Sequence, residues 1–189
     1  MGYKRLDPQA FVTAQETVIT GELVDAIRAV TEAPLGPRWV AHYECADDPP
    51  ITTPGRQGKR RRRVDIAFVR TQHGPRPRFQ MEAKRLHHGS SLDDYLGQDG
   101  LGRILSGAYA AQHPDAGMLG YVQDGKAADW ANRLRQRLAG PEGECFVREN
   151  GAFDDVKLCP GLSYTYHSGH DRATLHRPVE VYHTLLPFC

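Results

Sequence analysis

Two short runs of alternating apolar and polar residues near the middle of the chain most constrain its fold. The first run covers residues 64–68 and the second covers residues 79–84. Such alternation is typical of strands that bury one face. The intervening segment 71–75 contains Gly and Pro, as turns commonly do. The sequence therefore predicts a two-stranded hairpin whose apolar face consists of Val64, Ile66, Phe68, Phe79, Met81 and Ala83.

The opposite face of this hairpin carries residues suited to metal chemistry. Asp65 lies on the first strand, and Glu82 and Lys84 lie on the second. If the strands pair, Asp65 and Glu82 can converge on one cation, with the backbone carbonyl of Ala83 as a further ligand. A magnesium ion needs only one or two carboxylates beside substrate and water oxygens. It polarises a phosphoryl group and activates a bound water, while Lys84 can orient that water or stabilise developing charge. The pattern favours hydrolysis of a phosphodiester.

This arrangement resembles the PD-(D/E)xK nuclease superfamily over roughly the first two-thirds of the chain. Asp65 matches the first acid of the family, and Glu82-Ala83-Lys84 matches its acid-x-lysine element, although Val64 replaces the frequent proline. The resemblance implies an α/β fold in which helices flank a mixed central β-sheet, with a restriction-endonuclease-like core. It also implies an endonuclease that uses Mg²⁺ or Mn²⁺ to cleave DNA. Compact nucleases of this type resemble effectors of prokaryotic restriction or antiphage systems, with a partner subunit or a homodimer supplying recognition.

The family usually has an additional acid on a helix upstream of the hairpin. Residues 13–33 form an amphipathic pattern, with Val18, Leu23, Ile27 and Val30 near helical spacing. From this helix Glu22 can point toward the metal, so we include it among the catalytic residues. An acid on a helix surface is equally often only solvated.

Basic residues gather next to the proposed metal site, although the net charge of the chain is only +1. The run Lys59, Arg60, Arg61, Arg62 and Arg63 directly precedes Asp65, and these side chains can bind phosphates. A solubilising loop or a nuclear-import signal would show the same run. The predicted nucleic-acid contacts also include Arg85, together with Gln98, chosen by the resemblance, and Arg103.

Three alternatives remain beside a DNA endonuclease. The charged residues of the hairpin can be an ordinary solvated face, held by weak cross-strand pairs. The chain can be a non-catalytic nucleic-acid-binding or interaction subunit with the same fold. It can also be a hydrolase acting on RNA or on a nucleotide messenger.

We expect one domain over residues 1–189, with a core at about 13–140 and further strands at about 141–189. Additional strands are predicted at 38–45, 116–123, 162–167 and 179–186, and helices at 101–108 and 126–138. The C-terminal region contains His167, His170, His176 and His183, which invite a zinc hypothesis. Extension of the sheet by these strands is the alternative that we prefer.

The cysteines and the hydropathy indicate the compartment. Cys45, Cys145, Cys159 and Cys189 form no CxxC pair, and no secretory signal precedes them. No segment approaches the roughly 20 apolar residues of a membrane span. We therefore expect a soluble cytoplasmic protein with no membrane partner.

Overall fold

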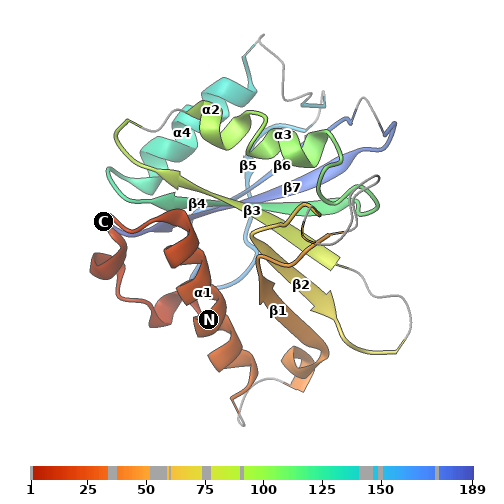
Figure 1. Cartoon of the computed structure of the whole chain (residues 1–189). Helices are drawn as coiled ribbons and strands as arrows, with labels where there is room; N and C mark the ends of the chain where they lie inside the picture. Colours follow the sequence, from red (N-terminus) through yellow and green to blue (C-terminus); the bar gives the residue numbers. More distant parts are fainter. Residues whose placement is uncertain are drawn as a thin grey trace.

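A seven-stranded mixed β-sheet lies between two layers of helix, as Figure 1 shows. The computed structural model describes residues 2–33, 38–51, 59, 61–73, 78–89, 92–140, 147–148, 151–172 and 175–189. The predicted α/β architecture with a mixed sheet is confirmed. In chain order the strands are β1 (Tyr43–Asp47), β2 (Ile66–Arg70), β3 (Arg78–Leu86), β4 (Asp115–Val122), β5 (Asp154–Asp155), β6 (Thr165–His170) and β7 (Val179–Pro187).

The strands follow the spatial order β1-β2-β3-β4-β7-β6-β5. The predicted hairpin of β2 and β3 is confirmed, and β1 extends it as an antiparallel edge strand. In the centre, β4 pairs in parallel with both β3 and β7. The C-terminal strands extend the sheet, as predicted, and β7 occupies a central position between β4 and β6. Residues far apart in sequence therefore share one continuous core.

Helices cover both faces of the sheet. On one face lies α1 (Glu16–Thr31), together with the short 3₁₀ helices η1 (Tyr3–Arg5) and η2 (Pro8–Phe11). The other face carries α2 (Leu92–Leu96), α3 (Leu101–Leu105) and α4 (Ala127–Leu138). Because both faces are covered, the polar residues of β3 are largely removed from water. The alternative of an ordinary solvated hairpin face does not describe Glu82, whose exposure is 1%.

The buried stripe of α1 differs from the predicted one. Ile19, Leu23 and Val24 are buried, whereas Val18 is 51% exposed. The helix also begins at Glu16, rather than at Thr13. A shift of one residue turns a helical face by about 100°, so the choice of stripe decides which acid faces the sheet. Only the packing of α1 on β1 and β3 fixes that choice.

Three predicted elements differ in their bounds. The segment 38–45 begins with a 3₁₀ helix, η3 (Arg38–His42), and only then enters β1. The predicted helix at 101–108 ends at Leu105, and the additional helix α2 precedes it. The predicted strand at 162–167 is displaced to Thr165–His170. By contrast, α4 buries the predicted face of Ala127, Trp130, Ala131, Leu134 and Leu138. No described helix is both long and apolar enough to cross a membrane.

Candidate active site

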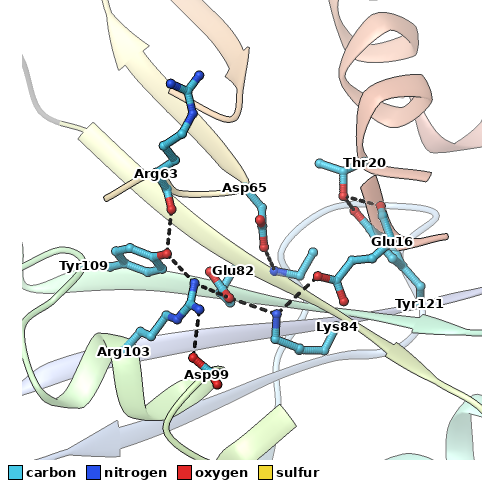
Figure 2. Close-up of polar contacts among 11 residues, drawn as sticks. Glu16, Thr20, Arg63, Asp65, Glu82, Lys84, Asp99, Arg103, Tyr109 and Tyr121 are labelled. Carbon is cyan, nitrogen blue, oxygen red and sulfur yellow. Dashed lines mark hydrogen bonds and ion pairs between the residues drawn. The ribbon is translucent and has the colours of Figure 1, made fainter. Parts of the chain in front are cut away.

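The candidate site lies where β2 separates from β3. Their pairing ends at Ile66 and Met81, but β3 continues to Leu86 beside β4. Beyond that point the carboxylate of Asp65 accepts the backbone N–H of Ala83 at 2.7 Å, as Figure 2 shows. In a strand the N–H and C=O of one residue point to the same edge. The carbonyl of Ala83 therefore lies at the same open edge as the Asp65 carboxylate.

Glu82 is the most deeply buried acid of the site, and its two oxygens have different surroundings. Oε1 faces two cations, Lys84 Nζ at 2.9 Å and Arg103 Nη1 at 3.4 Å. Oε2 is buried and accepts no hydrogen bond from the described residues while both acids are ionised, whereas the Glu82 and Asp65 carboxyls can share a proton. Burial, together with the charge of Asp65, raises the pKa of Glu82 to about 8. Burial and the nearby Asp65 therefore favour the protonated form of Glu82 when no further cation is close.

Lys84 joins two acids from different elements. Its Nζ lies 2.9 Å from Glu82 and 3.2 Å from Glu16, and its side chain is 14% exposed. Burial lowers the pKa of Lys84, but the carboxylates of Glu82 and Glu16 outweigh burial and raise it above its ordinary value. Lys84 is therefore a cation at neutral pH, so it can donate hydrogen bonds but cannot accept a proton.

The structure corrects the choice of the helix acid, because α1 brings Glu16 and not Glu22 to the site. Glu16 contacts Lys84, whereas Glu22 is exposed. Six helical positions separate these residues by about 240° around the axis. A signal for Glu16 was present in the sequence, since Glu16, Ile19, Thr20 and Leu23 share the i, i+3, i+4, i+7 stripe.

The N-terminal end of α1 is fastened to the sheet below it. The Thr20 hydroxyl donates to the backbone carbonyl of Glu16 at 2.8 Å, so the hydroxyl of Tyr121 on β4 donates to Thr20 at 2.9 Å. Burial raises the pKa of the Glu16 carboxyl, although the charge of Lys84 acts to lower it. Glu16 is thereby held at the edge of the site, where it contacts Lys84 and the backbone of Arg85.

Arg103 on α3 lies on the other side of Glu82. It donates to Tyr109 at 2.6 Å and to Asp99 at 2.8 Å. The Tyr109 hydroxyl in turn donates to the backbone carbonyl of Arg63 at 2.6 Å. This chain of bonds, visible at the left of Figure 2, ties the basic segment ahead of β2 to the acidic cluster.

Four of the predicted nucleic-acid contacts gather in one place. Arg62, Arg63, Gln98 and Arg103 line a cavity of about 560 Å³ beside Glu82. None of the other predicted contacts that the structure describes lines this cavity. Lys59 and Arg61 are exposed, Arg60 lies outside the described residues, and Arg85 alternates with Lys84 and so projects from the opposite face of β3.

The donor set fits a magnesium or manganese ion. Asp65, Glu82 and the Ala83 carbonyl would hold it. Glu16, which contacts Lys84 at 3.2 Å, would be a further acid at the edge of this site. In the described part of the chain, no group of three or more His, Cys, Asp or Glu side chains is arranged to hold a metal. Two carboxylates, a carbonyl and water meet the ordinary requirement of Mg²⁺. A cation bound beside Glu82 would give Oε2 a partner and would lower the raised pKa of that group.

The C-terminal histidines do not support the zinc hypothesis. His170 and His183 are buried, and each contacts the Ser168 hydroxyl at 2.7 Å. His167 instead pairs with Glu180 at 2.6 Å. These three histidines thus use ring nitrogens for contacts within β6 and β7.

Comparison with known proteins leaves the geometry to stand alone. No family model matches the chain, and neither a curated protein nor a solved structure shows a significant match.

Proposed function

We propose that this protein is a metal-dependent phosphodiesterase that cleaves nucleic acid, with DNA as its substrate. One observation carries the proposal. The buried Oε2 of Glu82 accepts no N–H from any residue that the structure describes, and burial together with the charge of Asp65 raises the pKa of Glu82 to about 8. Two close buried carboxylates are costly in a purely structural role, since each disfavours ionisation of the other. A shared divalent cation removes that cost.

The residues of the chain divide the work of hydrolysis. Asp65, Glu82 and the Ala83 carbonyl hold the ion, which supplies Lewis acidity and lowers the pKa of a bound water. Lys84 stays protonated and donates to the attacking water or to a phosphoryl oxygen, where its charge stabilises the transition state. Arg103 and Lys84 together neutralise Oε1 of Glu82 and fix the orientation of this carboxylate. Such outer contacts of a ligand commonly affect metal affinity about 10- to 100-fold.

The biological setting is proposed from the resemblance to PD-(D/E)xK nucleases. It is that of a cytoplasmic effector in a prokaryotic restriction or antiphage system. A chain of 189 residues leaves little room for a separate module that reads a sequence. We therefore propose that a partner subunit or a second copy provides target recognition.

The decisive experiment compares wild type with Glu82→Gln, Asp65→Asn and Lys84→Met on supercoiled plasmid, single-stranded DNA and RNA. The expected result is cleavage of DNA with Mg²⁺ or Mn²⁺, loss of at least 100-fold in each variant, and none in EDTA. Glu22→Gln is the matched control, because Glu22 is an exposed acid on α1, the helix that carries Glu16. Cleavage in EDTA, or undiminished cleavage by Glu82→Gln, would contradict the proposal.

Metal binding gives a second readout that does not depend on an activating partner. Titration calorimetry with Mn²⁺ should show a site in wild type that is lost in Glu82→Gln and kept in Glu22→Gln. A nucleic-acid-binding subunit without catalysis would bind DNA equally with and without metal. A preference for RNA over both forms of DNA would replace the substrate and keep the mechanism.

A further inference from the structure

The cavity beside Glu82 has the composition of an anion site. Arg62, Arg63 and Arg103 line it, with Gln98 and Asp99 at the turn between α2 and α3. Arg62 makes no ion pair among the described residues, whereas Arg63 pairs with the exposed Asp48 at 2.6 Å. The guanidinium of Arg103 connects the cavity to the metal site, because it also faces Glu82 Oε1 at 3.4 Å. Guanidinium groups are well suited to binding phosphate through paired N–H donors.

An acid of the chain already occupies part of this anion site. Asp99 lines the cavity and accepts from Arg103 Nη2 at 2.8 Å, as Figure 2 shows. The carboxylate is held loosely, since its side chain is 84% exposed and Arg103 is its sole ion-pair partner among the described residues. The hydrogen bond from Arg103, together with the charge of that residue, lowers the pKa of Asp99, so Asp99 is an anion at neutral pH. It therefore presents a negative charge to the guanidinium that a phosphate would otherwise contact.

The guanidinium itself is held firmly. Tyr109, which is 2% exposed, accepts from Arg103 and donates to the carbonyl of Arg63. Arg103 can thus exchange one anion for another on Nη2 while Nη1 keeps its contacts with Tyr109 and Glu82. The same bonds keep the Arg62–Arg63 segment at the rim of the cavity. The geometry is that of a preformed site with a replaceable occupant.

We propose that this cavity binds a phosphodiester group of a nucleic-acid strand, next to the one that is cleaved, and that Asp99 occupies Arg103 until the strand displaces it. The inference rests on the proposed function, and it assigns the cavity as the neighbouring phosphate subsite. Arg62 and Arg103 bind the phosphate. Asp99 competes with it and so reduces the affinity for any anion too weak to displace a carboxylate.

The test measures binding rather than cleavage, with Ca²⁺ in place of Mg²⁺ and a fluorescently labelled DNA oligonucleotide in both single- and double-stranded form. Asp99→Asn should bind two- to five-fold more tightly than wild type, because an exposed ion pair no longer has to be broken. Arg103→Gln should bind about ten-fold more weakly, and Arg62→Gln should also lose affinity and reduce the dependence on salt. Asp93→Asn is the matched control, since Asp93 forms a comparable exposed pair with Arg137 at 2.6 Å outside the cavity.

The outcomes separate the subsite from the proposed nuclease. Unchanged binding by both Asp99→Asn and Arg62→Gln would overturn the subsite, even if Glu82→Gln abolishes cleavage. Equal tightening by Asp99→Asn and Asp93→Asn would also overturn it, because that result reflects net charge alone. Competition by inorganic phosphate at concentrations that match the oligonucleotide would assign the cavity to free phosphate instead of a strand. The expected order of affinities in a protein without cleavage activity would support the subsite and count against the nuclease.

Discussion

The carboxylate of Asp65 accepts the backbone N–H of Ala83 at 2.7 Å, on the edge of β3 that faces β2. This contact lies beyond Met81, the last residue of β3 that pairs with β2. An acid that caps a strand edge in this way stands beside the Ala83 carbonyl and the Glu82 carboxyl at once. The candidate site therefore lies at the point where β2 and β3 separate.

Asp65 has two roles that two substitutions can separate. Asp65→Asn keeps an oxygen that can accept the Ala83 N–H but loses the charge needed for a metal. Asp65→Ala loses both, and an unsatisfied half-buried amide costs about 1–3 kcal/mol. We expect both variants to lose Mn²⁺ binding, and Asp65→Ala to be less stable than Asp65→Asn by roughly 1–2 kcal/mol in urea denaturation with EDTA. Equal stability of the two would show that the hydrogen bond to Ala83 contributes nothing.

Glu16 and Glu22 form a natural pair of test and control on one helix. Glu16→Gln removes the carboxylate that lies 3.2 Å from Lys84, so we expect Mn²⁺ affinity or cleavage to fall about 10- to 100-fold. Glu22→Gln changes an exposed side chain, and both quantities should stay as in wild type. Calorimetry and plasmid cleavage check this prediction, and a larger loss in Glu22→Gln than in Glu16→Gln would refute the assignment.

Glu82 predicts an unusual dependence of stability on pH in the metal-free protein. Burial and the Asp65 charge raise its pKa from 4.5 to about 8, so the folded state favours the protonated form. The contribution of Glu82 to stability is therefore fully present below about pH 4.5, falls as pH rises, and is lost above about pH 8. In EDTA, the Tm of Glu82→Gln relative to wild type should rise by about 5 °C between pH 5 and pH 8.

Metal should reverse this trend, because binding requires Glu82 to lose its proton. The increase in Tm on adding Mg²⁺ to wild type should grow from pH 6 to pH 8 and be absent in Glu82→Gln. Differential scanning calorimetry measures both effects on the same samples. A pH-independent difference between the two proteins in EDTA would mean that Glu82 is ionised at neutral pH.

His183 should make the opposite contribution at the acid end. It is fully buried beside Ser168 and Tyr95, and burial holds its pKa well below 6.5. Below about pH 6.5 the His183 ring is protonated in the unfolded chain but stays neutral in the folded protein. The contribution of His183 to stability is therefore present above about pH 6.5 and is lost as pH falls below it. Ring ¹H–¹⁵N NMR should show His183 neutral at pH 5.5, because its pKa is held well below the ordinary value. A charged His183 ring at that pH would contradict the prediction.

Local sequence patterns predicted much of this molecule because they report short-range physics. Alternation in 64–68 and 79–84 predicted the hairpin, and helical spacing predicted the buried face of α4. The same patterns predicted Glu82 and Lys84 on one strand, which is confirmed, whereas Asp65 precedes β2 instead of lying within it. Glu22 was predicted as the helix acid in place of Glu16 because several stripes of α1 are partly apolar, and only contact with the sheet selects one.

What the sequence determined by itself is that Glu82 and Lys84 share one face of a strand next to the segment that carries Asp65, since a strand of period two fixes which side chains share a face. What only the tertiary structure decided is their environment. Burial of Glu82 under α3, the arrival of Glu16 from α1 and the contact of Asp99 with Arg103 all join segments that are distant in the chain. Desolvation and charge coupling depend on such distances in space, and no local period encodes them.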